Sequence, residues 1–176
     1  MTRGLYAALA LQLIFFAGWG GRLLTSHRDV GVVWLATEPV DPRDLLSGNY
    51  VALRYGIART YCDRADGANE NLAIPVWVQL VPNGDQVPTA ETMATLSSAI
   101  ACRTTPPNLD DGTTWIMGRL EPGGDHITFG IERMFVGEDN PLRTATSGSV
   151  IAKVAINDTF EPRLLGLMTI RKEIAP

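Results

Sequence analysis

An uncharged run from Gly4 to Gly21 lies near the start of the chain. As a helix, a run of this length rises about 27 Å, close to the roughly 30 Å hydrocarbon core of a bilayer. Tyr6 and Trp19 lie near its two ends, where membrane-spanning helices commonly place aromatic residues at the interface. The run therefore predicts one transmembrane helix, and any globular domain must be built from the residues that follow it.

The apolar core of a cleaved signal peptide is the alternative interpretation of this run. The run is longer than a usual signal core, and Ala17-Gly18-Trp19 places a bulky Trp where a cleavage site needs a small residue. We therefore expect an uncleaved anchor over residues 1–28 and one β-rich domain over residues 29–176, a length that folds alone.

The orientation follows from the short tail that precedes the span. Arg3 and the terminal amine favour a cytoplasmic N-terminus, whereas Arg22 and Arg28 oppose it. A short N-terminal tail before a single span most often leaves the following domain outside the cytoplasm. We expect that orientation.

Charge is unevenly placed along the chain. All 19 acidic residues lie at or after Asp29, and the domain carries 12 basic residues, which gives it a formal charge of −7. An acidic domain repels phosphate backbones, because nucleic-acid affinity comes largely from Lys and Arg side chains that neutralise phosphates. Nucleic acid is therefore excluded as an expected partner.

The chain has two cysteines, Cys62 and Cys102, in no metal-binding spacing. Outside the cytoplasm they could form one disulfide, which in the chain-entropy model contributes about 4 kcal/mol. Two unpaired cysteines are the alternative, and the sequence leaves both open.

Alternating apolar residues predict a mainly β domain. Asp29–Thr37 is apolar on both faces, which predicts a strand buried on both sides. Further strands are expected at Tyr50–Tyr55 and at Ala73–Pro82, where Pro75 suggests a strand start or an edge and Asn83-Gly84-Asp85 predicts a turn. Thr89–Cys102 fits either a helix or a strand.

Two hairpins complete the predicted domain. Trp115–Leu120 and His126–Phe129 flank Gly123-Gly124-Asp125, and Val150–Ile156 is followed by Leu164–Ile170. Together these patterns predict about seven strands in a small β-barrel or β-sandwich.

Sequence patterns for catalysis, cofactors and metals are missing from the chain. Neither histidine, His27 or His126, belongs to a Ser/His or Cys/His motif. The only lysines are Lys153 and Lys172, and Ser47 directly precedes Gly48, which does not fit a serine/lysine peptidase. We expect no enzyme activity, cofactor or metal; a membrane-anchored hydrolase stays a remote alternative.

The segment Gly48-Asn49-Tyr50-Val51-Ala52-Leu53-Arg54-Tyr55 resembles the signature of the GDYXXLXY family of bacterial membrane-anchored proteins. The resemblance extends upstream to Val40–Leu46 and downstream to Phe129–Val136. It implies an inner-membrane location with a periplasmic domain, rather than a particular reaction. Asn49 departs from the family's Asp: it can accept a hydrogen bond but carries no carboxylate charge.

The resemblance also selects the candidate residues of an interaction surface. We expect a structural role for most of them, with turn residues before the strand and packing residues within it. Glu132 or Arg133 could point inward and pair with the charged turn residues, and a strand or short helix with one solvated face is the alternative. The candidates are Asp41, Arg43, Asp44, Gly48, Asn49, Tyr50, Leu53, Arg54, Tyr55 and Glu132.

These observations predict a single-pass protein whose β domain is an accessory or interaction subunit of a membrane assembly, with an integral membrane partner. Small residues along the helix, Ala7, Ala8, Ala10, Ala17 and Gly18, would permit close helix packing. The alternative is a cell-envelope ligand-binding or sensing domain, which requires a pocket near Arg43, Tyr50, Arg54 and Glu132.

Overall fold

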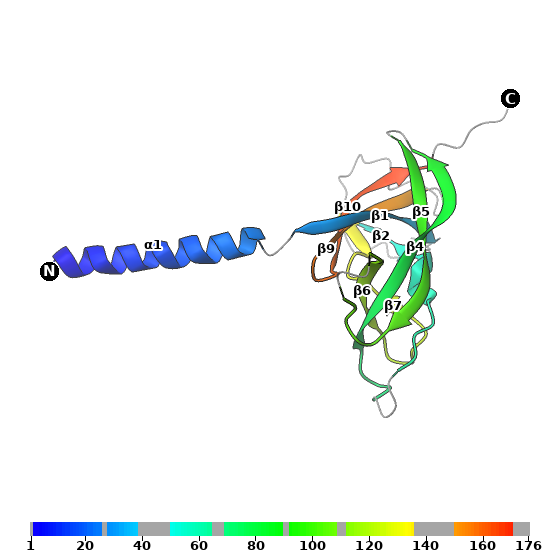
Figure 1. The fold of residues 1–176 in the computed structure, drawn as a ribbon, viewed down its shortest axis with the longest axis horizontal. Helices are drawn as coiled ribbons and strands as arrows, with labels where there is room; N and C mark the ends of the chain where they lie inside the picture. The colour runs from blue at the N-terminus through cyan, green and yellow to red at the C-terminus, as the bar shows by residue number, and fades with distance from the viewer. Residues whose placement is uncertain are drawn as a thin grey trace.

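The computed structural model describes residues 2–25, 28–38, 50–64, 69–89, 92–108, 112–135 and 150–170. These residues form one long helix followed by a β domain, which confirms the predicted fold class (Figure 1). In chain order the elements are α1 (Thr2–Thr25), β1 (Asp29–Glu38), β2 (Tyr50–Ala52), β3 (Arg54–Tyr55), the short 3-10 helix η1 (Gly56–Arg59), β4 (Ile74–Pro88), β5 (Met93–Arg103), β6 (Thr114–Leu120), β7 (Ile127–Thr128), β8 (Arg133–Phe135), β9 (Val150–Asn157) and β10 (Pro162–Thr169).

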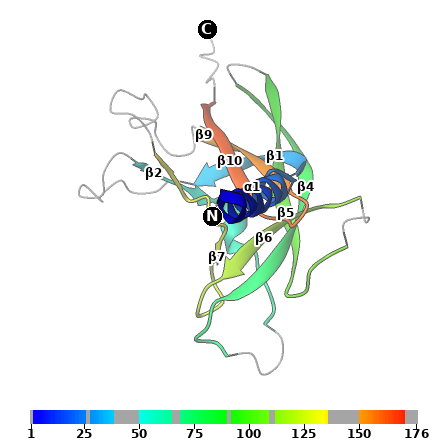
Figure 2. The same cartoon turned by 90° about the vertical axis from the view of Figure 1, so that its left-hand side faces the viewer.

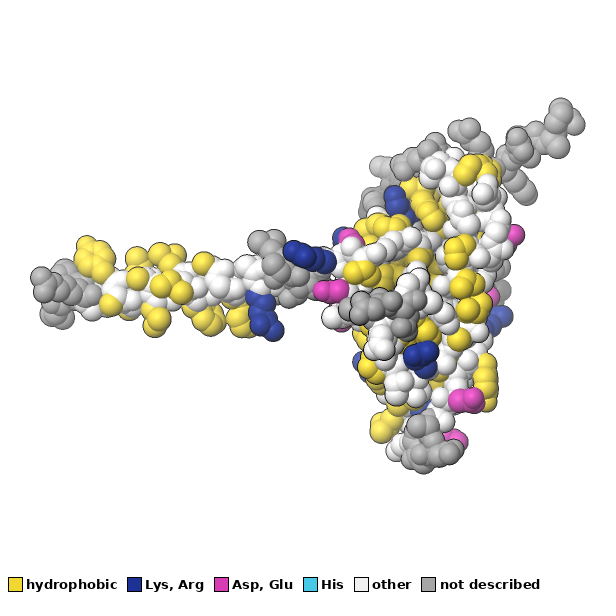
Figure 3. Space-filling model, in the orientation of Figure 1, with side chains coloured by type: hydrophobic (Ala, Val, Ile, Leu, Met, Phe, Trp, Pro, Cys, Tyr) yellow, Lys and Arg dark blue, Asp and Glu magenta, His cyan; other side chains and the backbone are white. Residues whose placement is uncertain are grey.

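Helix α1 has the length and composition of a membrane span over Gly4–Arg22, and no part of that apolar stretch is buried against the domain. Its large side chains are exposed, as for Ile14 at 70% and Phe16 at 60%. In Figure 3 hydrophobic side chains protrude along the whole visible side of the helix. A helix of this kind is compatible with a membrane anchor.

The domain is built on one eight-stranded sheet with the strand order β10-β9-β1-β5-β4-β6-β7, and β3 pairs with β1 beside this path. Strands β2 and β8 form a separate two-stranded sheet. Figure 2 shows β2 on the opposite side of the domain from β4 and β5. Among the described strands no ladder joins β10 to β7, so strand pairing does not close the sheet into a barrel.

The core lies on the inner face of the curved sheet. Its fully buried side chains come from strands that are distant in the chain: Leu35 from β1, Val78 from β4, Ile116 from β6 and Val154 from β9 are all 0% exposed. Burying an aliphatic side chain of this size contributes about 1.5–3 kcal/mol. The core therefore holds together strands from the beginning, the middle and the end of the domain, β1, β4, β6 and β9.

Strand β1 differs from its predicted burial on both faces. Its inward residues Val33 and Leu35 are buried, but the outward residues Val30 and Val32 are 58% and 49% exposed. The difference arises because β1 meets β5 at a single parallel register pair, Trp34↔Leu96. Beside that point the two strands diverge, and the outward face is left uncovered by the described residues.

The predicted turn at Asn83-Gly84-Asp85 is wrong: this segment is an irregularity inside the long strand β4. Pairing between β4 and β5 shifts register between Pro82 and Gln86 and then continues to Pro88. Gly84 has a φ of +85°, which favours glycine. Short-range hydrogen bonds between Asn83 and Asp85 satisfy the bulged residues locally, so the strand continues.

The β4–β5 hairpin also decides two other predictions for this region, the structure of Thr89–Cys102 and the place of Pro75. From Met93 onward the ambiguous segment Thr89–Cys102 is a strand, β5, and Thr89 closes the hairpin tip through hydrogen bonds with Thr92. Pro75 lies at the start of β4, as expected, but β4 is not an edge, because β5 and β6 pair with its two sides.

The turn between β9 and β10 links the β9–β10 hairpin to the other half of the sheet. The side-chain oxygen of buried Asn157 accepts hydrogen bonds from the backbone N–H groups of Thr159 and Glu161. The turn places Phe160 at a φ of 66°, and its carbonyl accepts the Met117 N–H of β6 at 2.7 Å. One hydrogen bond thus links the C-terminal hairpin to the far half of the sheet.

Candidate functional site

The signature segment is divided between the two sheets. We predicted one strand over Tyr50–Tyr55, but the chain forms β2 over Tyr50–Ala52, passes through Leu53, and then forms β3 over Arg54–Tyr55. Strand β3 joins the large sheet through the register pairs Thr37↔Tyr55 and Glu38↔Arg54. The signature is therefore the crossing point from the small sheet to the large one.

The small sheet pairs the signature with the downstream segment that shares the family resemblance. Strand β2 runs antiparallel to β8, with Tyr50 opposite Phe135 and Ala52 opposite Arg133. The Leu53 N–H then donates to the Glu132 carbonyl at 2.7 Å. Two segments about 80 residues apart in the chain, a separation that costs loop entropy to close, thus form one structural unit.

Tyr55 fastens this unit to the core. Its side chain is 1% exposed, and its hydroxyl donates a hydrogen bond to the Ile131 carbonyl at 2.7 Å. Burial, with a smaller contribution from the negative charge of Glu132, raises the pKa of Tyr55 well above its ordinary value. The phenol therefore stays protonated and acts as a hydrogen-bond donor.

Glu132 closes its own turn. Its carboxylate accepts the backbone N–H of Phe129, and Gly130 between them has a φ of +77°. The inward pairing with Arg43 or Asp44, one of the two alternatives for this segment, involves residues outside the described ones. In the described structure the role of Glu132 is local: it fixes the loop whose carbonyls receive Leu53 and Tyr55.

The predicted functional surface is divided by the alternation of the strand. Tyr55 points into the core and Arg54 is exposed, because successive residues of a strand face opposite sides. Arg54 and Tyr55, both candidates for the interaction surface, therefore cannot lie on one face of the strand. Leu53 is also buried in the core, at 7% exposed.

The other candidate residues of the signature region fall outside what the structure describes. They are Asp41, Arg43, Asp44, Gly48 and Asn49, and for Tyr50 only the backbone is described.

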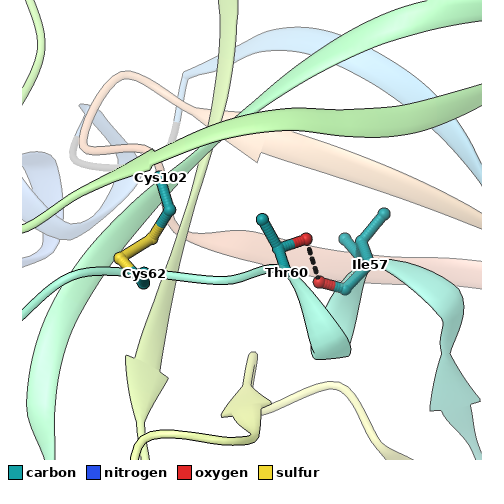
Figure 4. Close-up of a disulfide and its surroundings, with 4 residues drawn as sticks. All are labelled: Ile57, Thr60, Cys62 and Cys102. Atoms are coloured by element: carbon teal, nitrogen blue, oxygen red, sulfur yellow. Dashed lines mark hydrogen bonds between the residues drawn. A yellow bond between two sulfur atoms is a disulfide. The ribbon is translucent and has the colours of Figure 1, made fainter.

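A disulfide between Cys62 and Cys102 follows the signature directly (Figure 4). Tyr55 leads into η1, which the Thr60 hydroxyl closes by donating to the Ile57 carbonyl at 2.7 Å. Cys62 comes next and is bonded to Cys102 near the end of β5. Of the two alternatives left open by the sequence, the structure has the bridged one. The disulfide fastens the exit of the signature to the central hairpin.

Arg64 holds the neighbouring loop, a role that sequence reasoning missed. Its guanidinium donates to the carbonyls of Asn69, Leu72 and Glu121, at 3.1, 2.9 and 2.7 Å respectively. All three acceptors are backbone atoms, which any residue type supplies. No side-chain pattern could therefore have pointed to this interaction.

Two open grooves lie on either side of the β1–β5 crossing. The first has a volume of about 330 Å³ and is lined by Val32, Trp34 and Met93 among other uncharged residues; the second, of about 260 Å³, lies beside η1 and includes Arg59. Neither groove is lined by Arg54 or Glu132. These volumes lie near or below the low end of ligand pockets, which run from about 300 to 1,000 Å³.

The described residues include no group of three His, Cys, Asp or Glu side chains placed to hold a metal ion. Two buried polar side chains bond to backbone instead: Thr37 donates to the Val150 carbonyl at 2.6 Å, and Tyr55 donates to that of Ile131. The geometry of the described signature region is therefore that of a structural connection between the small sheet and the large one.

Comparison with family models matches residues 12–167 to the GDYXXLXY protein family, so the chain belongs to this family. Neither the search of curated proteins nor the search of solved structures returns a match.

Proposed function

We propose that this protein is a single-pass membrane-anchored accessory subunit. In this proposal the β domain is the interaction module of a membrane assembly, has no catalytic activity of its own, and binds an integral membrane partner. The observation that carries the proposal is α1: a helix long enough to cross a bilayer, with none of its apolar stretch buried by its own domain.

The face of α1 suited to a partner helix is marked by small residues. At about 100° of rotation per residue, Ala7, Ala10, Ala17 and Gly18 fall within an arc of about 100°. Small residues let two helix backbones approach closely in a membrane, where packing rather than hydrophobicity drives association. Ala8 lies roughly opposite this face, so it does not belong to the small face.

The disulfide supports a location outside the cytoplasm. Disulfides persist in oxidising compartments, and cytosolic reductants keep most thiols reduced. The Cys62–Cys102 bridge therefore favours a periplasmic β domain. The proposal combines this location with retention of α1 as an anchor in the bacterial inner membrane.

The absence of catalysis in the proposal is supported by how the conspicuous polar groups are used. Glu132 closes its own turn, and Tyr55 is a buried donor to a carbonyl. Both side chains already serve structural bonds, which leaves neither as an evident nucleophile or base.

Co-purification tests the proposal. The protein is extracted from its native membrane in mild detergent, and co-purifying chains are identified by mass spectrometry. A stoichiometric integral membrane protein is expected with the native chain and with Ala8→Leu, the matched control. Ala10→Leu combined with Ala17→Leu should lose it, because two bulky side chains separate the helices. Equal recovery with all three chains would rule out the helix as the contact, and no stoichiometric partner would overturn the accessory role.

A further inference from the structure

The outward side of β1 carries an apolar row next to the anchor. Val30 and Val32 are 58% and 49% exposed, and Trp34 continues the same side of the strand. The groove of about 330 Å³ lies beside Val32 and Trp34, and no charged residue lines it. We call Val30, Val32 and Trp34 the anchor-proximal row.

Chain length keeps this row close to the membrane. Only residues 26–29 lie between Thr25, the end of α1, and Val30. A fully extended chain spans at most about 3.6 Å per residue, so the Cα atoms of Thr25 and Val30 are at most about 18 Å apart. If α1 spans the bilayer, the row cannot leave the neighbourhood of the lipid headgroups.

Cationic side chains surround the row. Lys153 of β9 lies over the Trp34 ring at 5.4 Å from its centroid, and Arg28 is exposed just before β1. Arg163 of β10 is 61% exposed while it binds Asp29 at 2.6 Å. Figure 3 shows basic and acidic side chains next to one another where the helix meets the domain.

Three acidic residues lie in the same region. Arg163 binds Asp29, the Asp158 backbone N–H donates to the Arg28 carbonyl at 3.2 Å, and the Glu161 carboxylate accepts the Asn157 amide at 3.0 Å. Cations and carboxylates are therefore equal in number here, but Arg163 and Asp29 neutralise each other, whereas Lys153 lies over the Trp34 ring of the row itself. An exposed apolar strip flanked by Lys and Arg suits the interface of an anionic bilayer, where both attractions act together.

We propose that the anchor-proximal row rests on an anionic phospholipid surface and holds the β domain against the membrane. The inference rests on the membrane anchoring in the proposed function. It adds a second contact: the domain sits on the bilayer through one defined side of β1, and its other surfaces face away from the lipid.

Fluorescence quenching in vesicles tests this contact on the full chain. An environment-sensitive fluorophore is attached to Val30→Cys or to the matched control Ile100→Cys in vesicles of phosphatidylcholine and phosphatidylglycerol. The two native positions are equally exposed, at 58% and 59%, and the native cysteines are bridged. Because β5 runs parallel to β1 where Trp34 pairs with Leu96, Ile100 lies four residues beyond this pair in the direction away from α1, whereas Val30 lies four residues before it on the side of α1.

Lipids with a nitroxide at headgroup depth should quench the fluorophore at position 30 at least about threefold more than at position 100, and high salt should reduce the contrast. Equal access of a water-soluble quencher to both positions would overturn the proposal. So would shielding at position 30 without lipid quenching, which would mean that protein covers the row. Release of the chain by carbonate would overturn the anchor itself, a failure distinct from the other two.

Discussion

Helix α1 and strand β9 are both strongly apolar segments, but the first is exposed and the second is buried. In β9 every residue except Lys153 is buried, and Ile151, Ala152 and Val154 are 0% exposed. In α1 the apolar side chains are exposed throughout, as for Leu11 at 71%. Hydrophobicity alone therefore does not decide where a segment lies.

The difference follows from what each backbone can satisfy. A helix satisfies its own hydrogen bonds, so α1 can be surrounded by lipid. A strand needs partners, and β9 has them on both sides, β1 and β10. The domain consequently folds around β9, and α1 is left for the bilayer or a partner helix. The predictions below compare changes in these two kinds of apolar surface.

Charge introduced into each segment should give the largest effect. Val154→Asp should unfold the domain, because a buried carboxylate without a partner costs more than about 4 kcal/mol. Ile14→Asp should leave the domain folded but weaken membrane integration, since Asp at a helix centre costs about 2.5–3.5 kcal/mol on insertion. Near-UV circular dichroism and carbonate extraction measure the two properties. Loss of the domain fold in Ile14→Asp would contradict the conclusion that α1 does not take part in the fold of the domain.

Removal of the disulfide should also affect only the domain. Cys62→Ser with Cys102→Ser should lower the free energy of unfolding in urea by about 2–5 kcal/mol, because the unfolded chain regains the freedom of the closed loop. Membrane integration should not change. Reductant should destabilise the native chain by a similar amount and leave the double variant unaffected; an equal response of both chains would show that the bridge is not the cause.

Tyr55→Phe should have a smaller effect, a loss of about 1–3 kcal/mol, because it leaves the Ile131 carbonyl without its donor inside the core. Tyr61, which is 79% exposed, provides the control. Tyr61→Phe should change stability by less than about 0.5 kcal/mol. Equal effects in urea unfolding would mean that the bond to Ile131 adds nothing.

The raised pKa of Tyr55 predicts a pH dependence with a definite sign. Because the pKa is higher in the folded state, the stabilisation is fully present below the unfolded pKa of about 10 and is lost as the pH rises beyond it. The free energy of unfolding of the native chain should therefore fall above about pH 10. Tyr55→Phe should show a shallower fall, and parallel curves would contradict the assignment.

The smallest effect is expected on the outward side of β1, which resembles α1 more than β9. Val32→Thr should change the free energy of unfolding by less than about 0.5 kcal/mol, since Val32 is 49% exposed. Val33→Thr, one residue further and 8% exposed, should cost about 1–3 kcal/mol by burying a hydroxyl. Thermal unfolding of the two variants side by side measures the contrast, and equal losses would mean that the outward row is buried.

Local patterns were sufficient to predict the apolar helix, the mainly β class and both hairpins. The β6–β7 and β9–β10 pairs depend on neighbouring residues and on turn residues such as Gly123 and Asn157. The Asn83-Gly84-Asp85 prediction failed because pairing with β5 continued beyond the bulge. A local turn signal does not end a strand when a long partner strand continues to pair beyond it. The sequence did not show this partner, because the segment that forms β5 fitted either a helix or a strand.

The candidate site was predictable as a set of residues but not as a geometry. The resemblance selected both Tyr50–Tyr55 and the segment around Glu132, and the structure pairs them. Which atoms meet depends on contacts such as Tyr55 with Ile131, 76 residues apart in the chain. The disulfide was likewise undecided from sequence, because bridging needs two Cα atoms at a suitable separation, 5.1 Å here, and only the folded chain sets it.

An intact-mass measurement of the native protein from the membrane fraction, alkylated without reduction, tests the anchored and oxidised subunit most directly. The account predicts a chain that retains the apolar N-terminal run, with neither cysteine alkylated. A shorter chain lacking the apolar N-terminal run would show a cleaved signal sequence, and two alkylated cysteines would show a reduced domain; either result would contradict the account.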